Sequence, residues 1–126
     1  MAAPNIVNVA TITGITTFKA GINTEAAGVS VIVTNPASSG KVLKINSLVA
    51  SGIGETTGVT VKLHNVAAGA GASVSIATTV SVPTFSTLVI ISKENSIYVQ
   101  ENQSISAFKQ ANEGDIDVIC GYEDIS

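Results

Sequence analysis

Few side chains in this sequence could do chemistry, and the first to consider is its one histidine, His64. A catalytic triad needs a histidine beside a serine nucleophile and a carboxylate, and a zinc site needs three or four ligands. No second histidine is present to join His64, and no serine lies in a Gly-x-Ser-x-Gly elbow. We therefore expect His64 on the exposed polar face of a strand. We predict no catalytic, metal-binding or cofactor-binding residues and no enzyme activity.

Three carboxylates near the C-terminus form the next candidate group. Glu113, Asp115 and Asp117 are spaced by two, so a strand would place them on one face. Such a cluster could bind a hard cation such as Ca²⁺. The interpretation we favour is a solvated outer edge that discourages pairing between sheets.

The only cysteine, Cys120, has no partner for an internal disulfide. It belongs to an alternating run with Ile116, Val118 and Tyr122, which predicts an inward-facing position. We expect a buried structural thiol, because a reactive one would need a base or a cation nearby. One unpaired cysteine fits a reducing compartment or indifference to redox conditions.

The elements that carry these residues are predicted from period-two hydrophobicity. The segment Val59-Thr60-Val61-Lys62-Leu63-His64 alternates apolar and polar residues, the pattern of a half-buried strand. Similar runs, separated by Gly, Asn, Pro and Ser, recur about every ten residues. The expected extended segments are 5–13, 15–19, 29–35, 41–51, 59–65, 73–82, 85–92, 97–100, 103–109 and 115–122.

This spacing predicts a single all-β domain over residues 1–126: an antiparallel β-sandwich of jelly-roll type. An immunoglobulin-like sandwich is the alternative, although the sequence lacks its tryptophan and cysteine pair. Strict alternation in 41–51 places Leu43, Ile45, Ser47 and Val49 on one face and Leu48 on the other. The Ala- and Gly-rich segment 66–72 is predicted to be a flexible loop.

Composition excludes several classes of partner. Charged residues make up 12% of the chain, the net charge is −3, and all six basic residues are lysines. Without arginine or a basic stripe we expect no nucleic-acid binding and no polybasic membrane contact. The N-terminus resembles no signal peptide, and no apolar run has the length of a membrane span. A neutral surface of Ser, Thr, Asn, Gly and Ala is easy to desolvate, which suits either a surface covered by a repeating partner or simply a neutral, soluble coat.

Four stretches carry a family resemblance: MAAPNIVNVATITG, SSGKVLKINSLVAS, LVIISKENSIYVQENQSISAF and GDIDVICGYEDIS. Together they resemble a family of small virion structural proteins of tailed phages, known from marine cyanophages. The resemblance implies a non-enzymatic capsid decoration, or cement, protein that binds the outer capsid surface and stabilises the shell. Its expected partner is the major capsid protein. Many copies would sit on the capsid surface of the virion after synthesis in the host cytoplasm.

Two segments are predicted to make the contacts. Residues 1–13 form a possible N-terminal arm or edge strand, because both alternating sets of side chains are apolar, and such a segment could add to a capsid strand. A second two-faced run could lie at a homo-oligomer contact. The predicted interface residues are Asn5, Ile6, Val7, Asn8, Val9, Ile12, Leu88, Val89, Ile90 and Ile91.

The alternative function is a structural or receptor-binding module of the neck, tail or fibre. A glycan-binding module of this kind would be expected to show exposed aromatic residues or a metal cluster. The chain has five aromatic residues and no tryptophan, which favours the decoration hypothesis.

Overall fold

The computed structural model describes residues 11–110 and 114–126, which form nine strands and two short 3-10 turns. β-Branched residues dominate the strands, as expected for a pleated sheet. The elements are β1 (Ile12–Lys19), β2 (Ser30–Asn35), β3 (Val42–Ile53), β4 (Thr57–Val66), η2 (Ala67–Gly69), β5 (Ala70–Val82), β6 (Thr87–Ile91), η3 (Lys93–Asn95), β7 (Ile97–Val99), β8 (Gln103–Lys109) and β9 (Asp115–Ile125).

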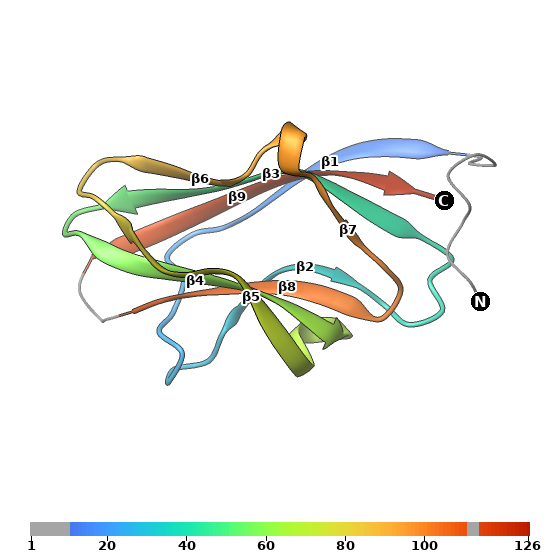
Figure 1. Ribbon diagram of the computed structural model, residues 1–126, viewed down its shortest axis with the longest axis horizontal. Coiled ribbons are helices and arrows are strands. Elements are labelled where there is room, and N and C mark those ends of the chain that lie inside the picture. Colours follow the sequence, from blue (N-terminus) through green and yellow to red (C-terminus); the bar gives the residue numbers. More distant parts are fainter. Residues whose placement is uncertain (1–10, 111–113) are drawn as a thin grey trace.

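The strands form two antiparallel sheets packed face to face (Figure 1). Sheet A has the order β1-β9-β3-β6, and the short β7 also pairs with β3. Sheet B has the order β2-β8-β4-β5. In Figure 1 sheet A is the upper layer and sheet B the lower one.

The chain follows the path of one long hairpin that has been rolled up. β4 pairs with β5 at its tip, β3 with β6 and β7, β2 with β8, and β1 with β9. Rolling then brings β9 against β3 and β8 against β4. This is the jelly-roll arrangement. The predicted jelly-roll sandwich is therefore confirmed, and the immunoglobulin-like alternative, whose sheets hold strands ABED and CFG, does not describe this order.

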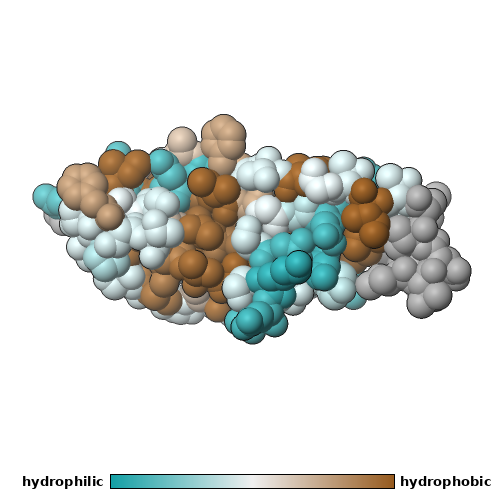
Figure 2. Space-filling view, turned by 90° about the horizontal axis from the view of Figure 1, so that it is seen from above, coloured by the Kyte–Doolittle hydropathy of each residue, from teal (hydrophilic) through white to brown (hydrophobic). Residues whose placement is uncertain are grey.

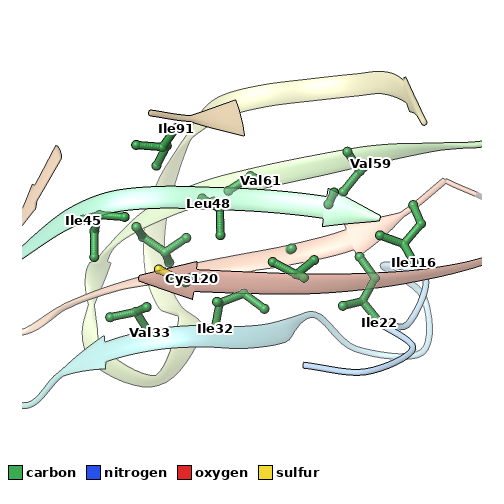
Figure 3. Packing of buried hydrophobic residues seen from close by; sticks show 14 of the residues in the cluster. Ile22, Ile32, Val33, Ile45, Leu48, Val59, Val61, Ile91, Ile116 and Cys120 are labelled. Atoms are coloured by element: carbon green, nitrogen blue, oxygen red, sulfur yellow. The ribbon is translucent and has the colours of Figure 1, made fainter. Parts of the chain in front are cut away.

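The core lies between the two sheets and is almost entirely aliphatic (Figure 3). Ile45 and Leu48 of sheet A and Val59 and Val61 of sheet B have no exposed surface. Ile22, in the connection from β1 to β2, closes one end of the core and donates its backbone N–H to the carbonyl of Ile116 at 2.9 Å. Apolar burial of this kind is the main favourable term in folding.

Bulges change which residues reach the core. The register of β3 shifts between Ile45 and Ser47, so Leu48 joins Ile45 inside and Val49 turns outward. The predicted strict alternation over 41–51 is wrong at this point, because a bulge inserts one unpaired residue. A second shift, between Val31 and Val33 of β2, lets both Ile32 and Val33 face the core (Figure 3).

Other boundaries also differ from the sequence prediction. Gly14 does not interrupt β1, because its backbone remains paired with Glu123 of β9. Thr11 and Ser126 exchange two backbone hydrogen bonds of 3.0 Å and extend that ladder. The predicted contact residues Asn5–Val9 lie outside the described residues. No helix in the described part of the chain is long and apolar enough to span a membrane.

Candidate functional surfaces

The histidine is not on an exposed face, so that prediction is wrong. His64 is only 6% exposed, and its Nε2 lies 2.6 Å from the Oγ of Ser106, which is fully buried on β8. Burial, with a smaller contribution from the charge of Lys62, lowers the pKa of His64 below its ordinary value of 6.5. The imidazole is therefore neutral at physiological pH.

The tip of the β4–β5 hairpin covers part of the outer face of sheet B. The η2 turn folds back over β8 and β2 and is held by side chains of those strands and of the turn before β8. Ala67 donates its N–H to Asn102 Oδ1 at 3.2 Å, Ala68 to Thr34 Oγ1 at 2.9 Å, and Gly69 to Ser104 Oγ at 2.8 Å. The predicted flexible loop at 66–72 is instead a hydrogen-bonded 3-10 turn between two strands. Alternation in sequence could not reveal this cover, because the cover comes from another part of the chain.

The His64–Ser106 pair has the residue types of a base and a nucleophile but not their arrangement. A triad needs a carboxylate that orients the other ring nitrogen. Nδ1 of His64 is buried and makes no hydrogen bond in the described part of the chain. Ser106 also has no exposed surface through which a substrate could reach it. The pair therefore acts as a polar cross-strand contact between β4 and β8.

The thiol of Cys120 lies in the core, as predicted (Figure 3). It has no exposed surface, and burial raises its pKa to about 12. A thiol with such a pKa is protonated at neutral pH and is a poor nucleophile and metal ligand.

The acidic residues of β9 do not converge on a common point. Asp115 is exposed and lies 3.6 Å from the Nζ of Lys109, whereas Asp117 accepts a hydrogen bond from the backbone N–H of Gly21 at 2.8 Å. Glu113 lies outside the described residues. Among residues 11–110 and 114–126 no group of three potential ligands is close enough to hold a metal ion.

One open depression of about 250 Å³ lies at the end of the sandwich beside the β4–β5 hairpin. Small-molecule sites usually combine an apolar wall with a few convergent polar or charged groups. This depression has no acidic, lysine or cysteine side chain in its lining, which comprises Leu63, His64, Asn65, Ala72, Ser73, Val74 and Gln103. Besides the buried imidazole of His64, its polar groups are the amides of Asn65 and Gln103 and the hydroxyl of Ser73. These groups do not form the convergent set that a small-molecule site needs.

The predicted contact run on β6 is divided between the inside and the outside. Ile91 is buried, and Leu88 and Ile90 pack against the core, so only Val89 of the four presents an exposed side chain. On the edge strand β1, Ile12 is 59% exposed.

A more extensive surface, of whose residues the sequence prediction named only Val89, crosses the outer face of sheet A. In the ladder, Phe18 is opposite Ile119, Ile119 is opposite Val49, and Val49 is opposite Val89. Opposed residues of neighbouring strands point to the same side. We call these four residues the apolar row.

The apolar row is largely open to solvent. Phe18 is 73% exposed, Val89 59% and Ile119 46%, while Val49 is partly exposed between them. Figure 2, which looks down on sheet A, shows a hydrophobic band across the face, with pale residues on one side and pale and strongly hydrophilic residues on the other. Contiguous apolar surface of this kind marks interaction sites in soluble proteins.

Comparisons with known proteins give a fold and no family. No family model matches the sequence, and no curated protein matches it. Among solved structures, the chain is similar to a protein described under the words "Bacillus endospore appendages form a novel family of disulfide-linked pili". The TM-score is 0.53 at 14% identity, over 92% of this chain and 87% of the other. At this identity the likeness supports the sandwich fold alone.

Proposed function

We propose that this chain is a non-enzymatic structural protein of a tailed-phage virion, a capsid decoration protein that binds the outer surface of the shell and stabilises it. The observation that carries the proposal is the apolar row, which leaves contiguous hydrophobic side chains open on the outer face of sheet A. Its surroundings suit adhesion as well. With 12% charged residues, the protein can be covered by a partner without stripping water from many ions.

The mechanism would be passive. Many identical copies would each bury part of their surface against the lattice and add contacts that resist internal pressure. An ordinary stable interface buries roughly 800 Å² per partner. The major capsid protein would be the partner, and the sequence resemblance to virion proteins supports that choice.

The second candidate is a subunit of a tail, fibre or other filament. The similarity to an appendage protein favours it, and so does β5, an edge strand of 13 residues without a charged side chain. Uncharged, unprotected edges readily pair with other strands. The similar appendages are described as disulfide-linked, whereas Cys120 of this chain is buried. A filament of this chain would therefore not be joined through that thiol.

Immunogold electron microscopy with antibodies against the recombinant chain tests the proposal. Virions from the producing lysate should carry label on the outside of the head. Label confined to the tail or to free filaments would replace decoration by the second candidate. Particles without label, from a lysate in which the chain is abundant, would overturn both.

A further inference from the structure

We propose that the outer face of sheet A docks onto the same face of a second copy, forming a two-fold dimer in which the two apolar rows lie against each other. This goes beyond the proposed function, because it names an interface of the free protein that requires no particle; on a capsid, the lattice would replace the second copy at the same face. Three observations carry it: the composition of the row, the residues that flank it, and the size of the face.

The first observation is the apolar row itself. It runs across four strands, and the two outer members, Phe18 and Val89, are its most exposed. In a two-fold dimer whose axis runs along the strands, between β9 and β3, the order across the sheet is reversed. Phe18 of one copy then meets Val89 of the other, and Ile119 meets Val49. All the central contacts are apolar.

The second observation is a flanking row that is complementary to itself. Gly14 is opposite Glu123, Glu123 is opposite Lys44, and Lys44 is opposite Tyr98. Reversal in the dimer places Lys44 over Glu123 of the second copy, and the bulky Tyr98 over Gly14. A Cβ built at Gly14 would meet nothing within 4 Å, so there is open space for a ring.

The flank on the other side of the apolar row obeys the same rule. Asp117 is opposite Ser51, and Ser51 is opposite Thr87. Reversal sets the carboxylate of Asp117 against the hydroxyl of Ser51 in the second copy. The hydroxyl can donate a hydrogen bond that the carboxylate accepts. The alternative axis, perpendicular to the strands, loses this match and brings Glu123 against Asp115. Charge complementarity therefore favours a second copy of this chain as the partner and a two-fold axis parallel to the strands.

The third observation is the size of the face. Four strands about 4.8 Å apart and about nine residues long at about 3.3 Å per residue give a flat projection of roughly 570 Å². Side chains raise the accessible area above that projection, toward the roughly 800 Å² per partner of a stable dimer. Two twisted sheets pack in this way at about 10 Å with an angle near −30°.

Sedimentation equilibrium of the purified full chain provides the first test. The wild type should approach twice its 12.7 kDa mass at micromolar concentrations. Ile119→Lys should raise the dimer dissociation constant by at least about 30-fold, as expected for a central contact residue. The matched control is Val74→Lys, which changes an equally apolar, 66% exposed residue on sheet B and should leave the dimer intact. Thermal unfolding by circular dichroism verifies that both variants are folded.

Charge reversal tests the axis. K44E and E123K should each be monomeric, since like charges would face each other in their homodimers. Mixed together, with one variant labelled with ¹⁵N, they should form a one-to-one dimer in native mass spectrometry. In each variant residues 44 and 123 carry the same charge. Opposite charges can therefore meet only between two different chains, so only pairing between chains explains this rescue.

Three outcomes would overturn the inference: a wild-type monomer at all concentrations, a dimer that survives Ile119→Lys, or no rescue in the mixture. If a monomeric wild type showed protection of this face only on virions, the occupant would be another protein and not a second copy. Failure of the dimer leaves immunogold labelling of virions unaffected, so the two proposals can fail separately.

Discussion

The outer faces of the two sheets differ in a way that their sequences conceal. On sheet B, the polar residues His64, Ser104 and Ser106 are buried, and His64 is hydrogen-bonded to Ser106 while Ser104 is hydrogen-bonded to the hairpin tip η2. On sheet A, apolar residues such as Phe18 and Ile119 are left open. The polar face makes hydrogen bonds within the chain, apart from the buried Nδ1 of His64, whereas the apolar row has no cover among the described residues. In the part of the chain that the structure describes, the apolar row of sheet A is therefore open to solvent, whereas the one histidine is enclosed.

The largest expected effect separates two neighbours on β3. Leu48→Ala should lower the free energy of unfolding by about 2–5 kcal/mol, because it opens a cavity in a fully packed core. Val49→Ala, one residue further on, should cost about 0.5–1 kcal/mol, because that side chain lies on the partly exposed outer face. Urea denaturation measures both. Equal losses would mean that the bulge at Asn46 does not turn Val49 outward.

The next effect tests the buried hydrogen bond between His64 and Ser106 on the outer face of sheet B. Ser106→Ala should cost about 1–3 kcal/mol, because it leaves the buried Nε2 of His64 without a partner. Ser75→Ala, at an exposed position of β5, should stay within about 0.5 kcal/mol. Chemical denaturation at neutral pH compares the two. If the serines proved equivalent, the hydrogen bond to His64 would contribute nothing.

The pH dependence of stability tests whether His64 is neutral in the folded chain. The pKa of His64 is lower in the folded chain than its ordinary value of 6.5. As the pH falls, the unfolded chain therefore takes up the proton near pH 6.5, before the folded chain does. Stability should therefore fall as the pH drops from about 7.5 to about 5.5. His64→Gln should remove that part of the slope, leaving the contribution of the carboxylates. Identical slopes in both proteins would contradict a buried neutral imidazole.

The smallest effect belongs to the open face of sheet A. Ile119→Thr retains a β-branched side chain and should change the stability of the monomer by no more than about 0.5 kcal/mol. Unfolding at concentrations below the dimer dissociation constant isolates this quantity. A loss as large as that of Leu48→Ala would show that Ile119 supports its own fold.

The sequence was sufficient for the strands and the sandwich, because period-two runs and turn residues are local signals. Val59 and Val61 face the core as their alternation predicts, and Cys120 lies where its run places it. The bulges at Asn46 and Ile32 were not predictable in this way, since one inserted residue leaves the composition of a strand unchanged. Their positions depend on the partner strand.

The surfaces were harder to predict, because they depend on which strands become neighbours. The alternation of its strand predicts an exposed His64, but the fold buries it beside Ser106 of β8. Phe18, Val49, Val89 and Ile119 are far apart in the sequence, and only the order β1-β9-β3-β6 aligns them. No local pattern carries that alignment.

The nested-hairpin path also determines at which stage of folding the apolar row is assembled. Pairs close in sequence, such as β4 with β5, can meet early, whereas β1 with β9 joins residues about a hundred positions apart and must close a very long loop. Chains dominated by such distant pairings reach the native state slowly, over milliseconds to seconds. Because the four members of the apolar row come from four distant segments, the row is complete only once the last strands have docked. A half-finished chain cannot yet present it to its neighbours.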